Sequence, residues 1–146
     1  MSVVIRRVVT PRIAAMINRA SGVTEAEALA RASARIEGLR AESLAALDVA
    51  LEAAEQAGRA DPADLDGLYD RASEVVELAG LYGLTGLGRA AYSLCDLADT
   101  LRAGGRTNAA AVAVHLEALR LLRHADDAVA APILDGLKAV AARVRG

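Results

Sequence analysis

Few side chains in this sequence are suited to chemistry, and the clearest are two histidines and one cysteine. His115 and His124 stand nine residues apart, which fits neither the HxxxH nor the ExxH spacing of a metal site on a helix. Cys95 is the only cysteine, so it has no partner for an internal disulfide and no second thiol for a metal. We predict no metal site and no cofactor, and we interpret Cys95 as a packing residue.

The acids and glycines give no stronger indication of catalysis. Asp96 and Asp99 could act as a general acid and base, but charged residues on amphipathic helices are usually solvated. The glycine-rich segment 83–88 follows a predicted helix and not a strand, unlike a phosphate-binding loop. The sequence has no P-loop or nucleophile-elbow motif. Enzymatic turnover other than phosphoryl transfer therefore has no support.

The composition indicates helices that pack closely through small side chains. Apolar residues make up 54% of the 146 residues, without Phe or Trp, and alanine and leucine dominate. A net charge of −2 gives no sign of the basic patch that nucleic-acid binding needs, so we expect no nucleic-acid partner. No apolar run is long enough to span a membrane, and the arginines in residues 1–9 are unlike a signal peptide. We expect one all-α domain over residues 1–146, soluble and cytoplasmic.

Capping residues and helical periodicity place six helices. Thr10-Pro11, the capping box Thr24 to Glu27, Asp61-Pro62, Thr107 and Pro132 are the predicted start signals. The predicted helices cover residues 11–20, 24–57, 62–80, 87–103, 107–124 and 131–145. Helix 107–124 carries a second apolar face, Val114, Ala118 and Leu121, which predicts two packing partners. The core of the domain is expected over about 24–124, with a helical extension at each end.

The segment around Ser73 carries a pattern of small, aliphatic and aromatic residues. The matching positions are Ala72, Val75, Ala79, Gly80, Tyr82, Gly83 and Leu87. This pattern resembles the signature of histidine phosphotransfer (HPt) domains, which are four-helix bundles. Ser73 stands at the position of the phospho-accepting histidine, and Val76-Glu77 replaces the Lys-Gly of that family. The resemblance implies a kept scaffold and a lost phospho-acceptor.

A wider resemblance covers most of the chain. The segments 78–80, 91–97 and 114–123 look like those of the CheE family, small proteins of alphaproteobacterial chemotaxis operons. That resemblance implies a role in chemotaxis or two-component signalling and offers no residue-level chemistry. The expected partner is a response-regulator receiver domain or a chemotaxis histidine kinase.

Two residues are candidates for carrying phosphate. A serine hydroxyl cannot replace an imidazole without a base, and Glu74 and Glu77 beside Ser73 would repel a phosphoryl group. We therefore interpret Ser73 as a boundary or docking residue. His115 falls within or at the edge of the buried stripe of its helix, where it is either a hydrogen-bonded core residue or a relocated phospho-acceptor. His124 is expected to lie at a helix C-terminus, where the helix dipole favours it.

Three functions follow from these observations. The first is a non-catalytic, HPt-like adaptor that binds its partner through one surface. Helical spacing and the resemblance place on that surface Asp66, Tyr69, Asp70, Ser73, Val76, Glu77, Gly80, Arg89 and Tyr92. The second is a phosphorelay protein that uses His115, and the third is a structural or oligomerising helical module, with a homodimer as an open alternative.

Overall fold

The computed structural model describes residues 22–146, which are helical and contain no strand. The predicted helix over 11–20 and the segment 1–9 lie outside the described residues. The chain divides into two compact units between Leu39 and Arg40. None of the described helices has the length and apolarity that crossing a bilayer would require.

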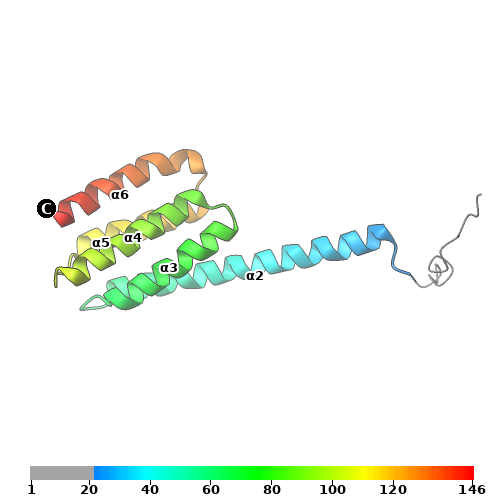
Figure 1. Ribbon diagram of the computed structural model, residues 1–146, viewed down its shortest axis with the longest axis horizontal. Helices are drawn as coiled ribbons and strands as arrows, with labels where there is room; N and C mark the ends of the chain where they lie inside the picture. The colour runs from blue at the N-terminus through cyan, green and yellow to red at the C-terminus, as the bar shows by residue number, and fades with distance from the viewer. Residues whose placement is uncertain (1–21) are drawn as a thin grey trace, which may run out of the picture. The chain divides into compact units, whose positions relative to one another are not determined.

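Five α-helices and one 3₁₀-helix follow one another along the described chain (Figure 1). They are α2 (Glu25–Arg59), α3 (Leu65–Leu81), α4 (Thr85–Ala103), α5 (Ala109–His124), the 3₁₀-helix η1 (Asp127–Val129) and α6 (Ala130–Arg145). The all-α prediction is confirmed. The predicted single domain over 1–146 stays a prediction.

The starts of three helices differ from the predicted ones, and the first of these differences is that α4 begins at Thr85 and not at Leu87. The Asp64 carboxylate accepts a hydrogen bond from the Gly67 amide at 2.9 Å, so α3 begins after Asp64 and not at Asp61. The Asn108 side chain accepts from Ala111 N–H at 3.0 Å, so Asn108 and not Thr107 caps α5. For α3 and α5, a second residue suited to capping follows the predicted cap. The side chain of this second residue accepts a hydrogen bond from a free amide of the first turn.

The unit that ends at Leu39 contains the first part of α2. The predicted capping box is confirmed, because Thr24 N–H donates to the Glu27 carboxylate at 2.8 Å and Glu27 N–H donates to Thr24 Oγ1 at 3.2 Å. Leu29 and Ile36 lie seven residues apart, on one face of the helix, and are 68% and 64% exposed.

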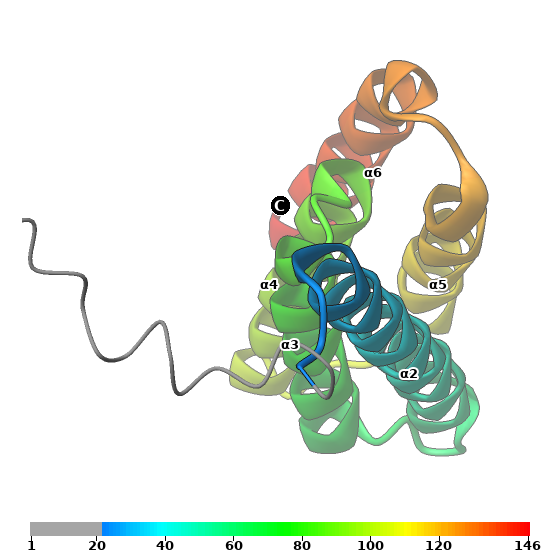
Figure 2. The same ribbon diagram turned by 90° about the vertical axis from the view of Figure 1, so that its right-hand side faces the viewer.

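The unit that begins at Arg40 is built around α4, which contacts α3, α5 and α6 (Figure 2). The periodic leucines of the sequence form its core, together with small residues. The fully buried large aliphatic residues are Leu47, Leu68, Val75, Leu87, Leu94, Leu97, Leu101, Val112, Leu119 and Leu137. They come from α2, α3, α4, α5 and α6, so one core holds all five helices of this unit together.

The prediction of a second packing face on α5 is wrong in part. Ala118 is buried, but Val114 and Leu121 are exposed. The other side of α5 that packs includes Ala111 and His115, and of these two residues hydropathy fails to mark only His115 as a buried position.

The C-terminal helix α6 belongs to the core. Leu134, Leu137 and Val144 are buried in the same cluster as the leucines of α4. The Gly86 amide at the start of α4 donates to Asp127 Oδ1 at 3.2 Å, at the beginning of the connection to α6. At the other end, the Arg106 guanidinium donates to the Val144 carbonyl at 3.1 Å. The helix is thus held to the rest of this unit along its whole length.

Candidate protein-interaction site

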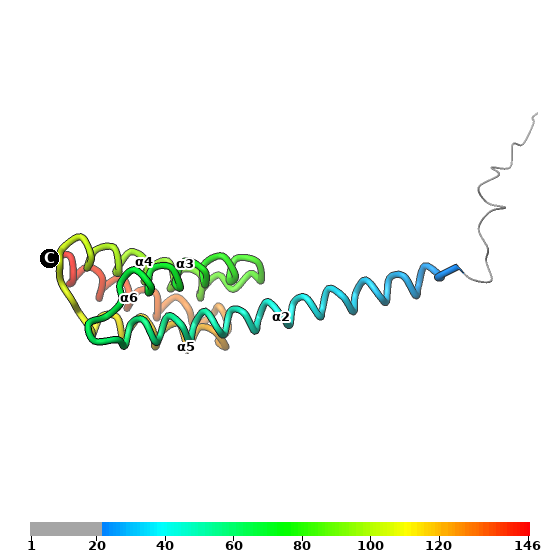
Figure 3. The backbone as a smooth tube through the Cα atoms, turned by 90° about the horizontal axis from the view of Figure 1, so that it is seen from below, coloured from blue at the N-terminus to red at the C-terminus, as the bar shows by residue number. Residues whose placement is uncertain are grey.

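The predicted partner surface lies on a hairpin of two antiparallel helices, α3 and α4 (Figure 3). The turn between them contains Gly83 with φ of +66°, a backbone conformation that favours glycine. Leu84 N–H donates to the Ala79 carbonyl at 2.9 Å, which satisfies a free carbonyl at the end of α3. The glycine of the Tyr82-Gly83 pair in the sequence pattern is therefore explained by the backbone conformation of this turn.

All nine predicted partner-binding residues reach solvent at least in part. Asp66, Asp70, Glu77, Gly80, Arg89 and Tyr92 are exposed, whereas Tyr69, Ser73 and Val76 are half-buried. Val76 and Gly80 of α3 line one groove together with Arg89 and Tyr92 of α4, so the two helices contribute to one continuous surface. We call the nine residues the α3–α4 surface.

Ser73 lies between the two helices, and no residue among 22–146 is placed to activate its hydroxyl. Its Oγ is 3.6 Å from Cys95 Sγ, and Cys95 Sγ in turn lies 3.8 Å from the Tyr69 carbonyl, to which the thiol donates. Burial raises the pKa of the Cys95 thiol, so it stays protonated and cannot accept a proton from Ser73. The Ser73 hydroxyl is held in a weak interhelical contact and is not prepared for nucleophilic attack.

Arg102 forms a cluster on the α3–α4 surface that sequence reasoning missed. Its guanidinium contacts Asp66 Oδ1 at 2.6 Å and also pairs with Asp99. The same guanidinium carbon lies 5.7 Å from the centre of the Tyr69 ring, within the range of a cation–π contact. The hydrogen bond with Asp66 raises the pKa of Arg102, and the charge of Asp99 adds to the effect. The three-residue spacing of Asp99 and Arg102 could have indicated their pairing.

His115 is fully buried, at 0% exposure, and both ring nitrogens have partners. Nδ1 lies 2.9 Å from the Ala111 carbonyl, which can only accept, so Nδ1 carries the proton and donates. Nε2 therefore accepts from the Ser93 hydroxyl at 3.1 Å. Burial lowers the pKa of His115, which stays neutral as a result.

This placement opposes the hypothesis of a relocated phospho-acceptor at His115. A phosphoryl donor needs an exposed imidazole nitrogen, and neither nitrogen of His115 reaches solvent. The nearby cations are also engaged, because Arg120 pairs with Glu55 and Glu117, and Arg123 contacts Asp48 at 2.7 Å. The interpretation as a hydrogen-bonded core residue agrees with these contacts.

His124 is the last residue of α5, as predicted, and lies on the surface. Within residues 22–146, no three histidine, cysteine or acidic side chains gather closely enough to hold a metal ion. Comparison with known proteins finds no matching family model, no matching curated protein and no matching solved structure.

Proposed function

We propose that this protein is a non-catalytic, HPt-like signalling adaptor that binds a receiver domain or a histidine kinase through the α3–α4 surface. In this proposal α2, α3, α4 and α5 form the four-helix unit of the resemblance, and α6 is an addition to it. The observation that supports it best is the arrangement around Ser73. The position of the expected phospho-histidine is accessible at the centre of a mixed apolar and acidic surface, but it carries a serine without a base.

The electrostatics of this surface favour binding over phosphoryl transfer. Asp70 and Glu77 are exposed on α3 and form no ion pair within the described residues. Their negative charge would oppose an incoming phosphoryl group, but it can pair with basic side chains of a docked protein. Tyr69 and Val76 add half-buried apolar area between these charges.

The proposal is tested by measuring the affinity of purified receiver domains and kinase domains of chemotaxis and two-component systems for the full chain. Tyr69→Ala combined with Glu77→Lys should weaken the binding of the true partner at least about tenfold, since both a central contact and a charge change. Glu117→Lys, which reverses a charge on α5 outside the surface, is the matched control. The helical circular dichroism signal should stay the same in both variants.

Phosphotransfer should be followed in the same samples. The adaptor should carry no phosphate itself while it changes the rate at which the kinase or receiver gains or loses phosphate. Labelling of the wild-type chain that disappears in Ser73→Ala or His115→Gln would contradict the adaptor and support a relay. Equal affinity of the wild type and of the Tyr69 and Glu77 variant would remove the α3–α4 surface from the proposal.

A second candidate is an oligomerising helical module. The observation that favours it is the pair of exposed aliphatic residues Leu29 and Ile36, seven residues apart on one face of α2. Analytical ultracentrifugation should then show a dimer that dissociates when Leu29 and Ile36 are replaced by Glu. A monomer at all concentrations would eliminate this candidate.

A further inference from the structure

The groove that Val76, Gly80, Arg89 and Tyr92 line has a volume of about 600 Å³ and lies among α3, α4 and α6, next to the α3–α4 turn. Its floor consists of small and apolar residues, among them Ala79, Gly88, Leu134 and Ala141. Gly88 and Ala79 lie next to each other, since a Cβ atom at Gly88 would be in ordinary contact with the Ala79 Cβ, at 3.6 Å. Small residues at these positions leave apolar space that no side chain of the described chain fills.

The two walls of this groove have the same length. The lining residues run from Thr85 to Asp96 on α4 and from Leu134 to Arg145 on α6, and they recur at steps of three and four residues. With a rise of about 1.5 Å per residue, each wall extends about 16 Å. That length corresponds to about three turns of a further helix lying along the groove.

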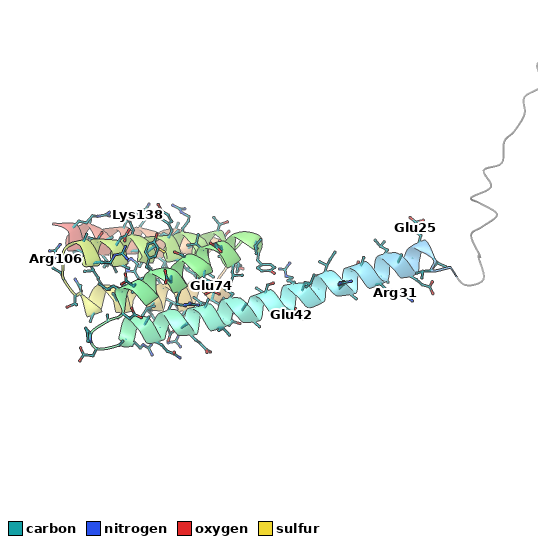
Figure 4. The ribbon with its side chains drawn as sticks, turned by 60° about the horizontal axis from the view of Figure 1, so that its bottom comes forward. Glu25, Arg31, Glu42, Glu74, Arg106 and Lys138 are labelled. Carbon is teal, nitrogen blue, oxygen red and sulfur yellow. The ribbon has the colours of Figure 1, made fainter. Side chains whose placement is uncertain are left out.

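The rim of the groove is basic, although the chain as a whole is acidic. Arg89, Lys138 and Arg145 line it against one acid, Asp96, which gives an excess of two positive charges in a chain of net charge −2. Asp96 is already paired with Arg145 at 3.3 Å, and Arg89 forms no ion pair within residues 22–146. Lys138 is an exposed residue of α6 (labelled in Figure 4), and its contact with Asp135 at 3.4 Å is solvent-exposed and weak.

One exposed aromatic residue completes the site. Tyr92 borders the groove on α4 and is 67% exposed. A tyrosine at the edge of an apolar depression supplies a large contact area and a hydroxyl group that can hydrogen-bond to a partner.

We propose that this groove binds an acidic amphipathic helix of a protein partner. The apolar face of that helix would cover Leu134 and Ala141, and its glutamates or aspartates would pair with Arg89 and Lys138. This goes beyond the proposed function, because α6 forms one wall and lies outside the α3–α4 surface.

The charge of the groove also distinguishes among occupants. Residues 1–20 of this chain carry four arginines, Arg6, Arg7, Arg12 and Arg19, and no acid. The basic rim would repel a segment of that composition. The partner is therefore expected to be another protein with an acidic helix.

The test uses a fluorescein-labelled peptide of about twelve residues with leucines at helical spacing and glutamates elsewhere, titrated into the full chain. A second peptide with lysines in place of the glutamates serves as the charge control. The glutamate peptide should bind, the lysine peptide should not, and binding should weaken between about 50 mM and 300 mM salt. Equal binding of both peptides, or no binding of either, would overturn the proposal.

Two sets of variants locate the binding. Arg89→Glu with Lys138→Glu should weaken glutamate-peptide binding on the order of tenfold and should create affinity for the lysine peptide. Arg71→Glu with Arg143→Glu, which changes exposed cations outside the groove on α3 and α6, should do neither. The gain of lysine-peptide binding separates a direct contact from a folding defect.

A steric variant tests the groove itself. Gly88→Leu places a side chain in the groove and should abolish peptide binding, whereas Gly136→Leu on the exposed side of α6 should leave it intact, as a Cβ there meets nothing within 4 Å. Val76, Gly80, Arg89 and Tyr92 belong to both the groove and the α3–α4 surface, but Gly88 and Lys138 belong to the groove alone. Failure of this test together with intact receiver binding would therefore overturn the groove proposal and leave the α3–α4 proposal standing. Conversely, loss of receiver binding in the Tyr69 and Glu77 variant should not affect the peptide.

Discussion

The buried imidazole of His115 predicts a pH dependence of stability that one substitution should remove. Burial lowers the pKa of His115 in the folded protein below its usual value of 6.5. The unfolded chain therefore binds a proton at a pH at which the folded protein does not. The contribution of the neutral His115 to the free energy of unfolding is therefore complete above about pH 6.5. It is lost as the pH falls toward the folded-state pKa.

The size of the effect follows from proton binding to the unfolded state. At pH 5.5, about ten of eleven unfolded chains carry the proton at this position if the unfolded pKa is about 6.5. This binding favours unfolding by up to about 1.4 kcal/mol relative to pH 7.5. The pKa of Glu27 is lowered by the backbone hydrogen bond from Thr24, so this carboxylate titrates below the window.

The assay is urea unfolding at several pH values between 7.5 and 5.5, for the wild type and for two single-histidine variants. The chain has only two histidines, so His115→Gln and His124→Gln form a matched pair. His115→Gln should be less stable by about 1–3 kcal/mol at pH 7.5, because it disturbs the buried contacts with Ser93 and Ala111. It should also lose most of the decline toward pH 5.5, which His124→Gln should retain.

The reasoning would be refuted if His115→Gln kept the full pH dependence. It would also fail if the imidazole of His115 titrated by NMR in the folded protein at or above pH 6.5. Either result would mean that the ring reaches water, and an accessible ring would restore His115 as a possible phospho-acceptor.

Three further predictions concern the helix start, the packing and the thiol. Asn108→Ala should cost about 0.5–2 kcal/mol in chemical denaturation, whereas Thr107→Ala should cost almost nothing, because only Asn108 caps α5. Gly86→Ala should lower the melting temperature, because the new Cβ would lie 2.7 Å from the Ala130 Cβ. Gly136→Ala should raise the melting temperature, because it removes a glycine from an exposed helix position. Equal shifts in the two variants would contradict this prediction. Cys95 should react with a thiol reagent far more slowly in the native than in the unfolded protein, because burial raises its pKa; equal rates would refute its burial.

The helices could be predicted well because their signals are local. Alternation of leucine and alanine at steps of three and four marks the buried faces, and the capping box at Thr24 fixes one helix start. The starts of α3 and α5 were harder, because two candidate caps stand close together in each case. Choosing between Asp61 and Asp64 depends on which side chain meets a free amide, and that is a matter of geometry.

The site could be predicted only in part. The α3 residues of the α3–α4 surface could be predicted, because they lie at helical spacing within one continuous segment of the sequence. The Asp66 to Arg102 contact and the basic groove depend on how distant segments pack, since Lys138 and Arg89 come from different helices. Hydropathy alone could not show that His115 is a core residue. A buried histidine needs hydrogen-bond partners, and one of them is the hydroxyl of Ser93 on another helix.

The attachment of α6 has a practical consequence for anyone who dissects this protein. A chain cut after His124 would keep α2 to α5, but it would uncover the apolar surface that Leu134, Leu137 and Val144 of α6 cover. Each of these side chains contributes about 1.5–3 kcal/mol when fully buried. The shortened protein would expose an apolar surface and bind many proteins nonspecifically, so a search for partners should use a chain that retains α6.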